Sequence, residues 1–371
     1  MLKWRVDVNE YVKHDAIGLA ELVRRGDATA SELVDVALQL IKKLNPALNA
    51  VVVIRNEASR RDAIDPPNGP FQGVPFLVKD MDGVLADEPN TSSSRSLVDW
   101  RPQQDSELFA RYKRAGLMIV GKTNAPEFGI MGVTESELRG PCRNPWNLDH
   151  TPGGSSGGSA ASVAARIVPA AHAGDGGGSI RIPASACGIF GIKPTRGRQP
   201  LGPYIGEGWD GLVVPHVVSR SVRDSAALLD VTRGADVGAP YAEPKGPKSF
   251  LLDSLRHPGK LRIGYSTKAM LGPETDPDAS AATLDAVILL RGLGHELVEV
   301  DLPLDPPALV KAYLTAVSAN VSADIAGTEK LTGKRPSPDM FELPTWFLGQ
   351  IGNVLEMDLD VRSRMVGGNT T

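Results

Sequence analysis

Hydrophobic positions near the N-terminus recur three and four residues apart, the spacing of one helix face. The segment TASE at positions 29–32 precedes them and has the pattern of a capping box. In that motif a hydroxyl and a carboxylate accept the free backbone N–H groups of the first turn. The pair Asn45-Pro46 is predicted to end this helix, because the residue before a proline is disfavoured in the helical conformation. The apolar positions are Leu33, Val36, Leu40, Ile41 and Leu44.

Short apolar runs alternate with further helical patterns along the rest of the chain. The alternation is typical of an α/β layered fold with a largely parallel sheet. One of the runs, GVPFLVKD, ends in the charged pair Lys79-Asp80. The predicted strands are 50–54, 73–80, 117–123, 167–173, 261–267 and 295–302, and the predicted helices are 106–116, 159–167, 221–234 and 279–294.

The amino-acid composition indicates a globular protein and argues against several other classes. With 42% hydrophobic and 23% charged residues among 371, the chain can bury a globular core. A net charge of −4 and an aromatic content of 5% argue against nucleic-acid binding. The N-terminus lacks the apolar stretch of a signal peptide, and no run reaches the roughly 20 apolar residues that span a bilayer. Two cysteines fit a reducing compartment. We therefore expect a cytoplasmic protein that binds neither nucleic acid nor membrane.

Glycine, present 39 times, gathers in two clusters at 151–159 and 173–188. Because apolar segments flank both clusters, a flexible linker is the weaker interpretation, and loops that present backbone N–H groups to a ligand are favoured. No Gly-Lys-Ser/Thr follows that would make a P-loop, and the G-x-G-x-x-G match at 206–211 lies among prolines with no helix pattern after it.

The segment 153–157 also matches the nucleophile elbow G-x-S-x-G, which requires a downstream histidine as base. A Ser-His-Asp esterase therefore remains a minor alternative, with His172, His216, His257 and His295 as the candidate bases. A lysine can also serve as the base for a serine, but only in its neutral form. Burial at the end of an apolar strand favours that form, and a second serine could relay the proton. These residues allow such a mechanism without assigning its parts.

The run GGSSGGSAASVAARIVPAAHAGDGGGSIRIPASACGIFGIKPTRGR at 153–198 closely resembles the signature of the amidase signature family of Ser-cisSer-Lys amide hydrolases. Shorter matches support it, and the similarity extends from about residue 10 to residue 300. Within the family, the chain is most similar to the bacterial amidases grouped with the 6-aminohexanoate cyclic-dimer hydrolases. The shorter matches are GVPFLVKD (73–80), GKTNAPEFG (121–129), RNPWN (143–147) and SVRDSAALLD (221–230).

The resemblance implies a role for each matching position. Ser179 would be the nucleophile, Ser155 the cis-peptide serine and Lys79 the base, with the two serines at the family's usual separation of 24 residues. An acyl-enzyme would form on Ser179 and be hydrolysed by water. The backbone N–H groups of the turn that ends at Ser179 would stabilise the oxyanion. The supporting residues implied by the resemblance are Gly176, Gly177 and Gly178 in the turn, Ser156 beside the substrate, and Asp175 and Arg181 behind the loop.

The family also implies a fold: an α/β/α sandwich with a large twisted, mixed but mostly parallel sheet covered by helices on both faces. We expect one domain over 1–371, with an N-terminal helical region (1–65), a signature core (66–241), a linker-like loop (242–260) and a C-terminal part (261–371). The resemblance implies a small-molecule amide as substrate, without a metal or another cofactor. A homodimer is compatible with it.

Two departures from the family pattern stand out. Gly174 occupies a position where relatives often carry Ser or Thr. Family members usually continue beyond the point where this chain stops, and the additional segment forms part of the pocket wall. The alternative hypothesis is therefore a truncated, weakly active or inactive remnant that serves as an interaction module.

Overall fold

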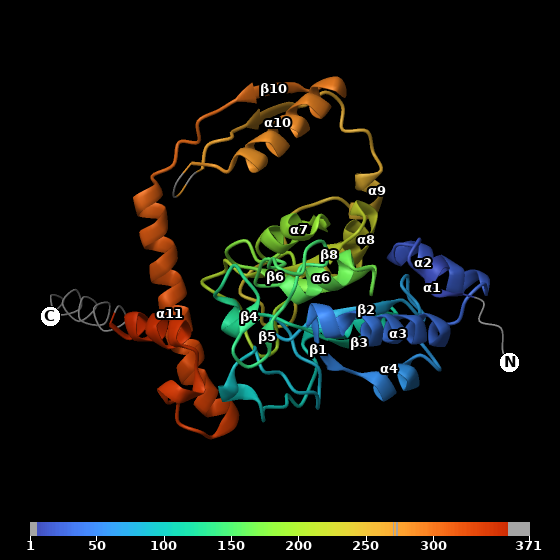
Figure 1. The fold of residues 1–371 in the computed structure, drawn as a ribbon, viewed down its shortest axis with the longest axis horizontal. Helices are drawn as coiled ribbons and strands as arrows, with labels where there is room; N and C mark the ends of the chain where they lie inside the picture. The colour runs from blue at the N-terminus through green and yellow to red at the C-terminus, as the bar shows by residue number, and fades with distance from the viewer. Residues whose placement is uncertain (1–5, 270, 272–273, 355–371) are drawn as a thin grey trace. The chain divides into compact units, whose positions relative to one another are not determined.

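The computed structural model describes residues 6–269, 271 and 274–354 (Figure 1). The chain divides into two compact units. The larger unit contains the residues up to 254 and those from 318 onward, and the smaller unit contains residues 255–317. The predicted linker-like segment 242–260 includes a short helix, α9 (Phe250–Ser254).

A six-stranded sheet with the order β1-β3-β2-β6-β8-β7 forms the centre of the larger unit. The strands β3, β2 and β6 run parallel, whereas β1 against β3, β6 against β8 and β8 against β7 are antiparallel. The strands are β1 (Val51–Ile54), β2 (Pro75–Lys79), β3 (Met118–Thr123), β6 (Ala170–Asp175), β7 (Phe190–Gly191) and β8 (Val214–Ser219).

The sheet is mixed, as predicted, but its parallel part is smaller than predicted. The difference arises at β8, which the hydrophobic pattern did not identify as a strand. The chain reaches β8 from β7 through a loop at 192–213 that contains no crossover helix. A connection without a crossover helix is typical of antiparallel neighbours, and β8 pairs antiparallel with β7 and also with β6.

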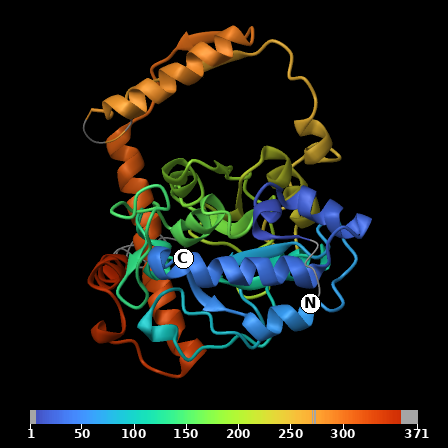
Figure 2. The same ribbon diagram turned by 45° about the vertical axis from the view of Figure 1, so that its right-hand side comes forward.

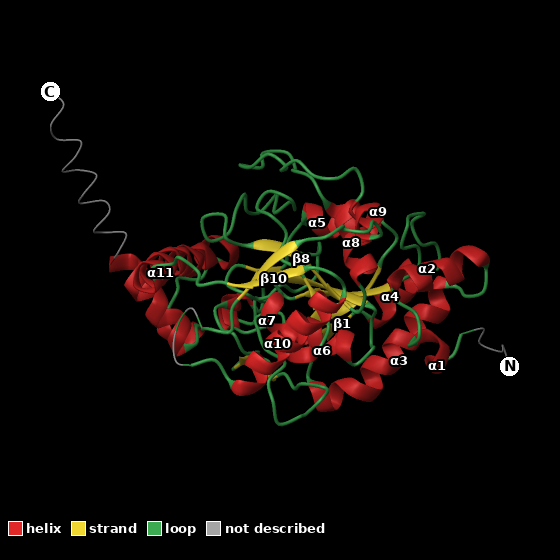
Figure 3. Cartoon of the chain, turned by 90° about the horizontal axis from the view of Figure 1, so that it is seen from above, coloured by secondary structure: helices red, strands yellow, loops and turns green. Residues whose placement is uncertain are grey.

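Helices surround the sheet (Figure 3). Figures 1 and 2 both show α3 lying along the sheet, and it contacts β2 and β3. The helix α6 packs on β6 and on the central strands, and α8 packs on β8. The helices of this unit include α1 (Val8–Tyr11), α2 (Ala16–Arg25), α3 (Ala30–Leu48), α4 (Asn56–Asp62), α5 (Glu107–Arg114), α6 (Gly157–Ala164), α7 (Arg181–Cys187), α8 (Val222–Thr232) and α9.

The first predicted helix shows how the local sequence directs this packing. The capping box forms, with Thr29 and Glu32 each accepting the other's backbone N–H. The expected stop at Asn45-Pro46 is wrong, because α3 continues to Leu48. Proline lies in the last turn, where its missing N–H removes only one helical bond. The Asn45 side chain then accepts the N–H groups of Ala50 and Val51 and directs the chain into β1.

The inner strands are buried along their whole length. Every residue of β2, β3, β6 and β8 is buried, as expected for strands covered on both faces. Polar side chains among them include Lys79 at the end of β2, Lys122 near the end of β3, and His172 and Asp175 on β6. Each of these buried groups needs a partner, and their partners define the site described below.

The smaller unit contains a parallel pair of strands, β9 (Arg262–Tyr265) and β10 (Glu296–Glu299), joined through α10 (Pro277–Gly292). The long helix α11 (Pro306–Thr332) begins in this unit, and its residues from 318 onward belong to the larger one. The remaining short elements are the strands β4 (Glu135–Ser136) and β5 (Gly140–Pro141) and the 3-10 turns η1 (Arg95–Leu97), η2 (Glu127–Gly129) and η3 (Pro338–Met340).

Candidate active site

A cavity of about 430 Å³ in the larger unit is lined by Lys79, Ser155 and Ser179. The three side chains come from the end of β2, from the loop before α6 and from the turn after β6. Since β2 and β6 are parallel neighbours, both supply the cavity from their carboxyl ends, where open α/β sheets commonly bind ligands.

Lys79 is 1% exposed and directs its ammonium group toward two oxygen atoms. The Nζ atom lies 2.8 Å from Ser155 Oγ and 2.9 Å from Asp82 Oδ2. Ser155 is also buried, and the peptide bond that joins it to Gly154 is cis. The predicted lysine and one of the two predicted serines are therefore in direct hydrogen-bond contact.

Ser179 lies on a turn that is fixed by Asp175. The Asp175 carboxylate accepts the backbone N–H groups of Gly178, at 2.7 Å, and of Ile180, at 3.2 Å. The Arg181 guanidinium donates to both oxygens of that carboxylate, at 2.9 and 3.0 Å. Burial acts to raise the pKa of Asp175, but these donors outweigh it and lower the pKa below its usual value. The turn is thus anchored by a carboxylate that stays ionised.

Backbone geometry in this turn leaves donors for a ligand. Gly178 has φ +128°, which favours glycine, and its N–H is used by Asp175. The N–H groups of Gly177 and Ser179 donate to no acceptor within the described part of the chain. Gly176 lines the cavity, and Gly177 is exposed. Two backbone donors on either side of Gly178, one of them on the serine itself, could therefore hold an oxyanion.

Ser156 joins the two glycine-rich loops. Its backbone N–H donates to Ser179 O at 3.3 Å, and its side chain bonds the backbone of Gly174 at 3.3 Å. The side chain is fully buried, which places it behind the two loops.

Asp80, next to Lys79, engages a separate buried cluster. Its carboxylate accepts from the Thr91 hydroxyl at 2.5 Å and lies 3.6 Å from Lys122 Nζ and 3.7 Å from Arg139. Burial raises the pKa of Asp80 in spite of these cations, and burial lowers the pKa of Lys122. We assign this cluster a structural role, since it holds the ends of β2 and β3.

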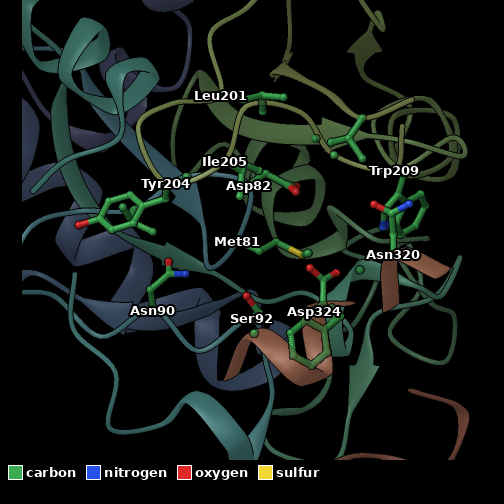
Figure 4. Close-up of a pocket in the computed structure, with 18 of the residues that line it drawn as sticks. Met81, Asp82, Asn90, Ser92, Leu201, Tyr204, Ile205, Trp209, Asn320 and Asp324 are labelled. Carbon is green, nitrogen blue, oxygen red and sulfur yellow. The ribbon is translucent and has the colours of Figure 1, made fainter. Parts of the chain in front are cut away.

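The outer walls of the cavity are mainly apolar and aromatic. They include Leu201, Tyr204, Ile205 and Trp209, and the α11 residues Asn320 and Asp324 line the same cavity (Figure 4). Asp324 is an exposed residue. The surrounding protein atoms nevertheless desolvate its carboxyl group and, with the charge of Asp82, raise its pKa to about 6.

Sequence reasoning missed Asp82 and the residues of α11. For Asp82 a signal was present, because a carboxylate three positions after the candidate base in KDMD lies within side-chain reach. The segment 306–332 carried no chemical motif. Its contribution to the cavity depends on a long-range contact that periodicity does not encode.

Among the described residues, no imidazole ring of the candidate histidines is hydrogen-bonded to Ser155, Ser156 or Ser179. His172 is buried, and its Nδ1 accepts the backbone N–H of Lys79 at 3.3 Å. His216 Nε2 lies 2.8 Å from Ser225 Oγ, away from the cavity. His257 and His295 belong to the smaller unit. The contacts around the loops therefore give no support to a Ser-His-Asp arrangement.

Metal sites and membrane-spanning helices are two other features on which a function could depend. In the described ranges, no group of three or more His, Cys, Asp or Glu side chains is arranged to hold a metal ion. A helix both long and apolar enough to cross a bilayer is likewise not found among those residues. Cys142 and Cys187 are both buried, and burial raises the pKa of both thiols.

Comparison with known proteins identifies the sequence family. The family model described as Amidase matches residues 32–353. A 6-aminohexanoate-cyclic-dimer hydrolase of Pseudomonas sp. is 38% identical over 338 residues, which are 90% of this chain and 68% of the relative. A lipoamidase of Enterococcus faecalis is 38% identical over 350 residues, covering 92% of this chain and 45% of that protein.

Solved structures agree with these matches. The 6-aminohexanoate cyclic dimer hydrolase complexed with substrate superimposes with a TM-score of 0.87 at 36% identity, covering 92% of this chain and 72% of the other. A bacterial aryl acylamidase of the amidase signature family gives a TM-score of 0.83 at 28% identity, with 91% and 72% of the two chains covered.

Proposed function

Because this chain belongs to the amidase signature family, we propose that it hydrolyses a carbon–nitrogen amide bond with Ser179 as nucleophile, Ser155 as proton relay and Lys79 as base. The observation that carries the proposal is the 2.8 Å contact between Lys79 Nζ and Ser155 Oγ in a cavity that Ser179 also lines. The substrate would be a small amide that enters this cavity, and the acyl-enzyme intermediate would form on Ser179.

Acylation begins with Lys79 in its neutral amine form. The Ser155 proton moves to Lys79 Nζ while the Ser179 proton moves to Ser155 Oγ, and Ser179 Oγ forms a bond to the carbonyl carbon. The carbonyl π electrons move to oxygen, and the backbone N–H groups of Gly177 and Ser179 stabilise the resulting oxyanion. One such donor typically contributes about 100-fold to 1,000-fold in rate.

The tetrahedral intermediate then collapses. The carbon–nitrogen bond breaks, and the leaving nitrogen takes a proton from Ser155, which is resupplied by the Lys79 ammonium. This leaves an ester on Ser179 and a neutral lysine. Water then attacks the ester carbonyl carbon, and its proton passes through Ser155 to Lys79. The bond between Ser179 Oγ and the acyl carbon breaks, and Ser179 takes a proton back through Ser155, which releases the acid and restores the Ser179 hydroxyl.

Covalent labelling with a fluorophosphonate probe tests the assignment of the nucleophile. Ser179→Ala is expected to abolish labelling, and Ser155→Ala and Lys79→Met to slow it by more than tenfold. The matched control is Ser185→Ala, which changes an exposed serine on α7, and it should label like the wild type. Full labelling of the Ser179→Ala variant would disprove the proposed nucleophile.

A panel of short linear and cyclic amides tests the reaction class. The expected result is release of an amine and a carboxylic acid in equal amounts, dependent on Ser179. A wild-type chain that is labelled by the probe yet hydrolyses neither amides nor esters of the panel would favour the alternative, an inactive remnant.

A further inference from the structure

The catalytic lysine has a second polar partner that the family resemblance did not supply. Asp82 Oδ2 lies 2.9 Å from Lys79 Nζ, and the side chains are 15% and 1% exposed. Asp82 has φ +61°, in the left-handed region that few residues other than glycine, asparagine and aspartate adopt. The turn after β2 therefore takes an uncommon backbone conformation at the residue that meets the lysine.

Gly174 provides the space for this carboxylate. A Cβ atom at position 174 would lie 2.2 Å from Asp82 Oδ2 and 2.6 Å from its Cγ. Both distances are far below van der Waals contact, so any side chain at 174 would displace the carboxylate from its present position. The absence of a side chain at position 174 and the Lys79–Asp82 contact are therefore one feature of the structure.

We propose that Asp82 is a positioning residue that orients Lys79 and stabilises the ammonium formed when Lys79 accepts the relayed proton. The inference rests on the proposed function. During acylation the proton lost by Ser155 becomes part of the Lys79 ammonium, 2.9 Å from a carboxylate. The arrangement parallels the third group that orients the base in other hydrolases. No proton is transferred to Asp82 in this scheme.

The other ionisable groups near Lys79 do not take this role. Burial lowers the pKa of His172 on β6 to about 3, so it is neutral above pH 5. Asp175 on β6 is paired with Arg181, and Asp80 faces Lys122. The charge of Asp82 helps to raise the pKa of Asp324 on α11, but Asp324 makes no hydrogen bond or ion pair with Lys79 among the described residues. Asp82 is the carboxylate in direct contact.

The pH dependence of probe labelling tests this role, because it requires no knowledge of the natural substrate. The neutral amine of Lys79 is the reactive form, and a carboxylate at 2.9 Å favours the ammonium. Asp82→Asn should therefore move the acid limb of the rate profile to lower pH. Gly174→Ala should shift it in the same direction, because its Cβ displaces the carboxylate.

Three further variants make the test specific. Asp105→Asn removes the carboxylate paired with Lys113 at 2.6 Å, away from the cavity lining, and should leave the limb unchanged. In an Asp324→Asn background the shift caused by Asp82→Asn should persist. The Asp82→Asn/Gly174→Ala double variant should shift no further than Asp82→Asn alone, since both changes remove the same contact.

An acid limb that stays in place in Asp82→Asn, with Ser179 still required for labelling, would overturn the role of Asp82 but not the proposed function. Labelling that persists in Ser179→Ala would instead overturn the proposed function. If Asp82→Asn fails to fold, Asp82→Ala/Gly174→Ser places a hydroxyl in the vacated space. The same shift to lower pH is then expected, and its absence would refute the inference.

Discussion

Lys122→Met tests the buried cluster of Asp80 and Lys122 beside the candidate active site. Lys122 Nζ lies 3.6 Å from Asp80 Oδ1, and both side chains are 0% exposed. The same ammonium donates to Asn90 Oδ1 at 3.2 Å and to the carbonyl oxygen of Pro89. Methionine matches most of the aliphatic stem but leaves the carboxylate and two acceptors without this donor. The change therefore removes the positive charge and its hydrogen bonds while keeping most of the apolar packing of the side chain.

The expected loss follows from these contacts. Removing one partner of a buried ion pair typically costs about 3–5 kcal/mol, because the remaining charge is uncompensated. Asp80 keeps the Thr91 hydroxyl at 2.5 Å and Arg139 at 3.7 Å. These contacts favour the lower end of that range, and the two orphaned acceptors add to the cost. We expect the free energy of unfolding to fall by about 3 kcal/mol at pH 8.

The loss should depend on pH. Burial raises the pKa of Asp80 above its unfolded value, so the native state binds more protons and stability declines as pH rises. Without the Lys122 charge this decline is steeper, and the deficit should be smaller at pH 5 than at pH 8. Urea unfolding followed by tryptophan fluorescence at both pH values measures it.

The matched control is Lys113→Met. Lys113 pairs with Asp105 at 2.6 Å, but the two side chains are 38% and 20% exposed, and such pairs contribute less than about 1 kcal/mol. A Lys122→Met deficit no larger than that of the control, or one that is equal at the two pH values, would refute the reasoning.

Two further predictions concern Arg181 and the cysteines. Arg181→Met should lower the thermal unfolding midpoint at pH 7. Because the lowered pKa of Asp175 stabilises the fold only while that carboxylate is ionised, the difference from wild type should begin to shrink as the pH falls below about 4 and disappear once Asp175 is protonated in the folded state. A difference that stays constant from pH 7 to pH 3 would contradict this. Burial raises the pKa of Cys187 to about 12 and that of Cys142 also above its usual value, so iodoacetamide at pH 8 should modify both thiols in denaturant but neither in the native protein, as read by mass spectrometry. Rapid native alkylation of Cys187 would disprove it.

Local patterns predicted much of the fold. The apolar runs at 50–54, 73–80 and 117–123 became β1, β2 and β3, and the helical patterns at 106–116 and 221–234 became α5 and α8. These elements carry their signal within a few residues. The direction in which strands pair carries no such local signal. The strand β8 itself was missed, although it is buried throughout, because it follows a loop rich in glycine and proline and contains Pro215.

The candidate site was predicted mainly by family resemblance. Residue chemistry alone suggested two serine-bearing glycine loops and a lysine, but it did not show which serine Lys79 contacts. The structure brings Lys79 to Ser155, separated by 76 residues in sequence. It also brings Asp82 to Gly174, a contact that depends on the absence of a side chain. Hydrophobic periodicity predicts which face of a helix or strand is buried, but it does not predict which residues of a distant segment pack against that face.

The adjacent residues Lys79 and Asp80 also determine how β2 aligns with its neighbours. Successive side chains of a strand point to opposite faces, and here one face offers Ser155 and Asp82 while the other offers Lys122 and Arg139. A shift of one residue would exchange the two, placing an ammonium against Lys122 and Arg139 and a carboxylate beside Asp82. Both outcomes bury like charges together. The buried charges at this end of β2 therefore also disfavour misaligned pairing of the strand.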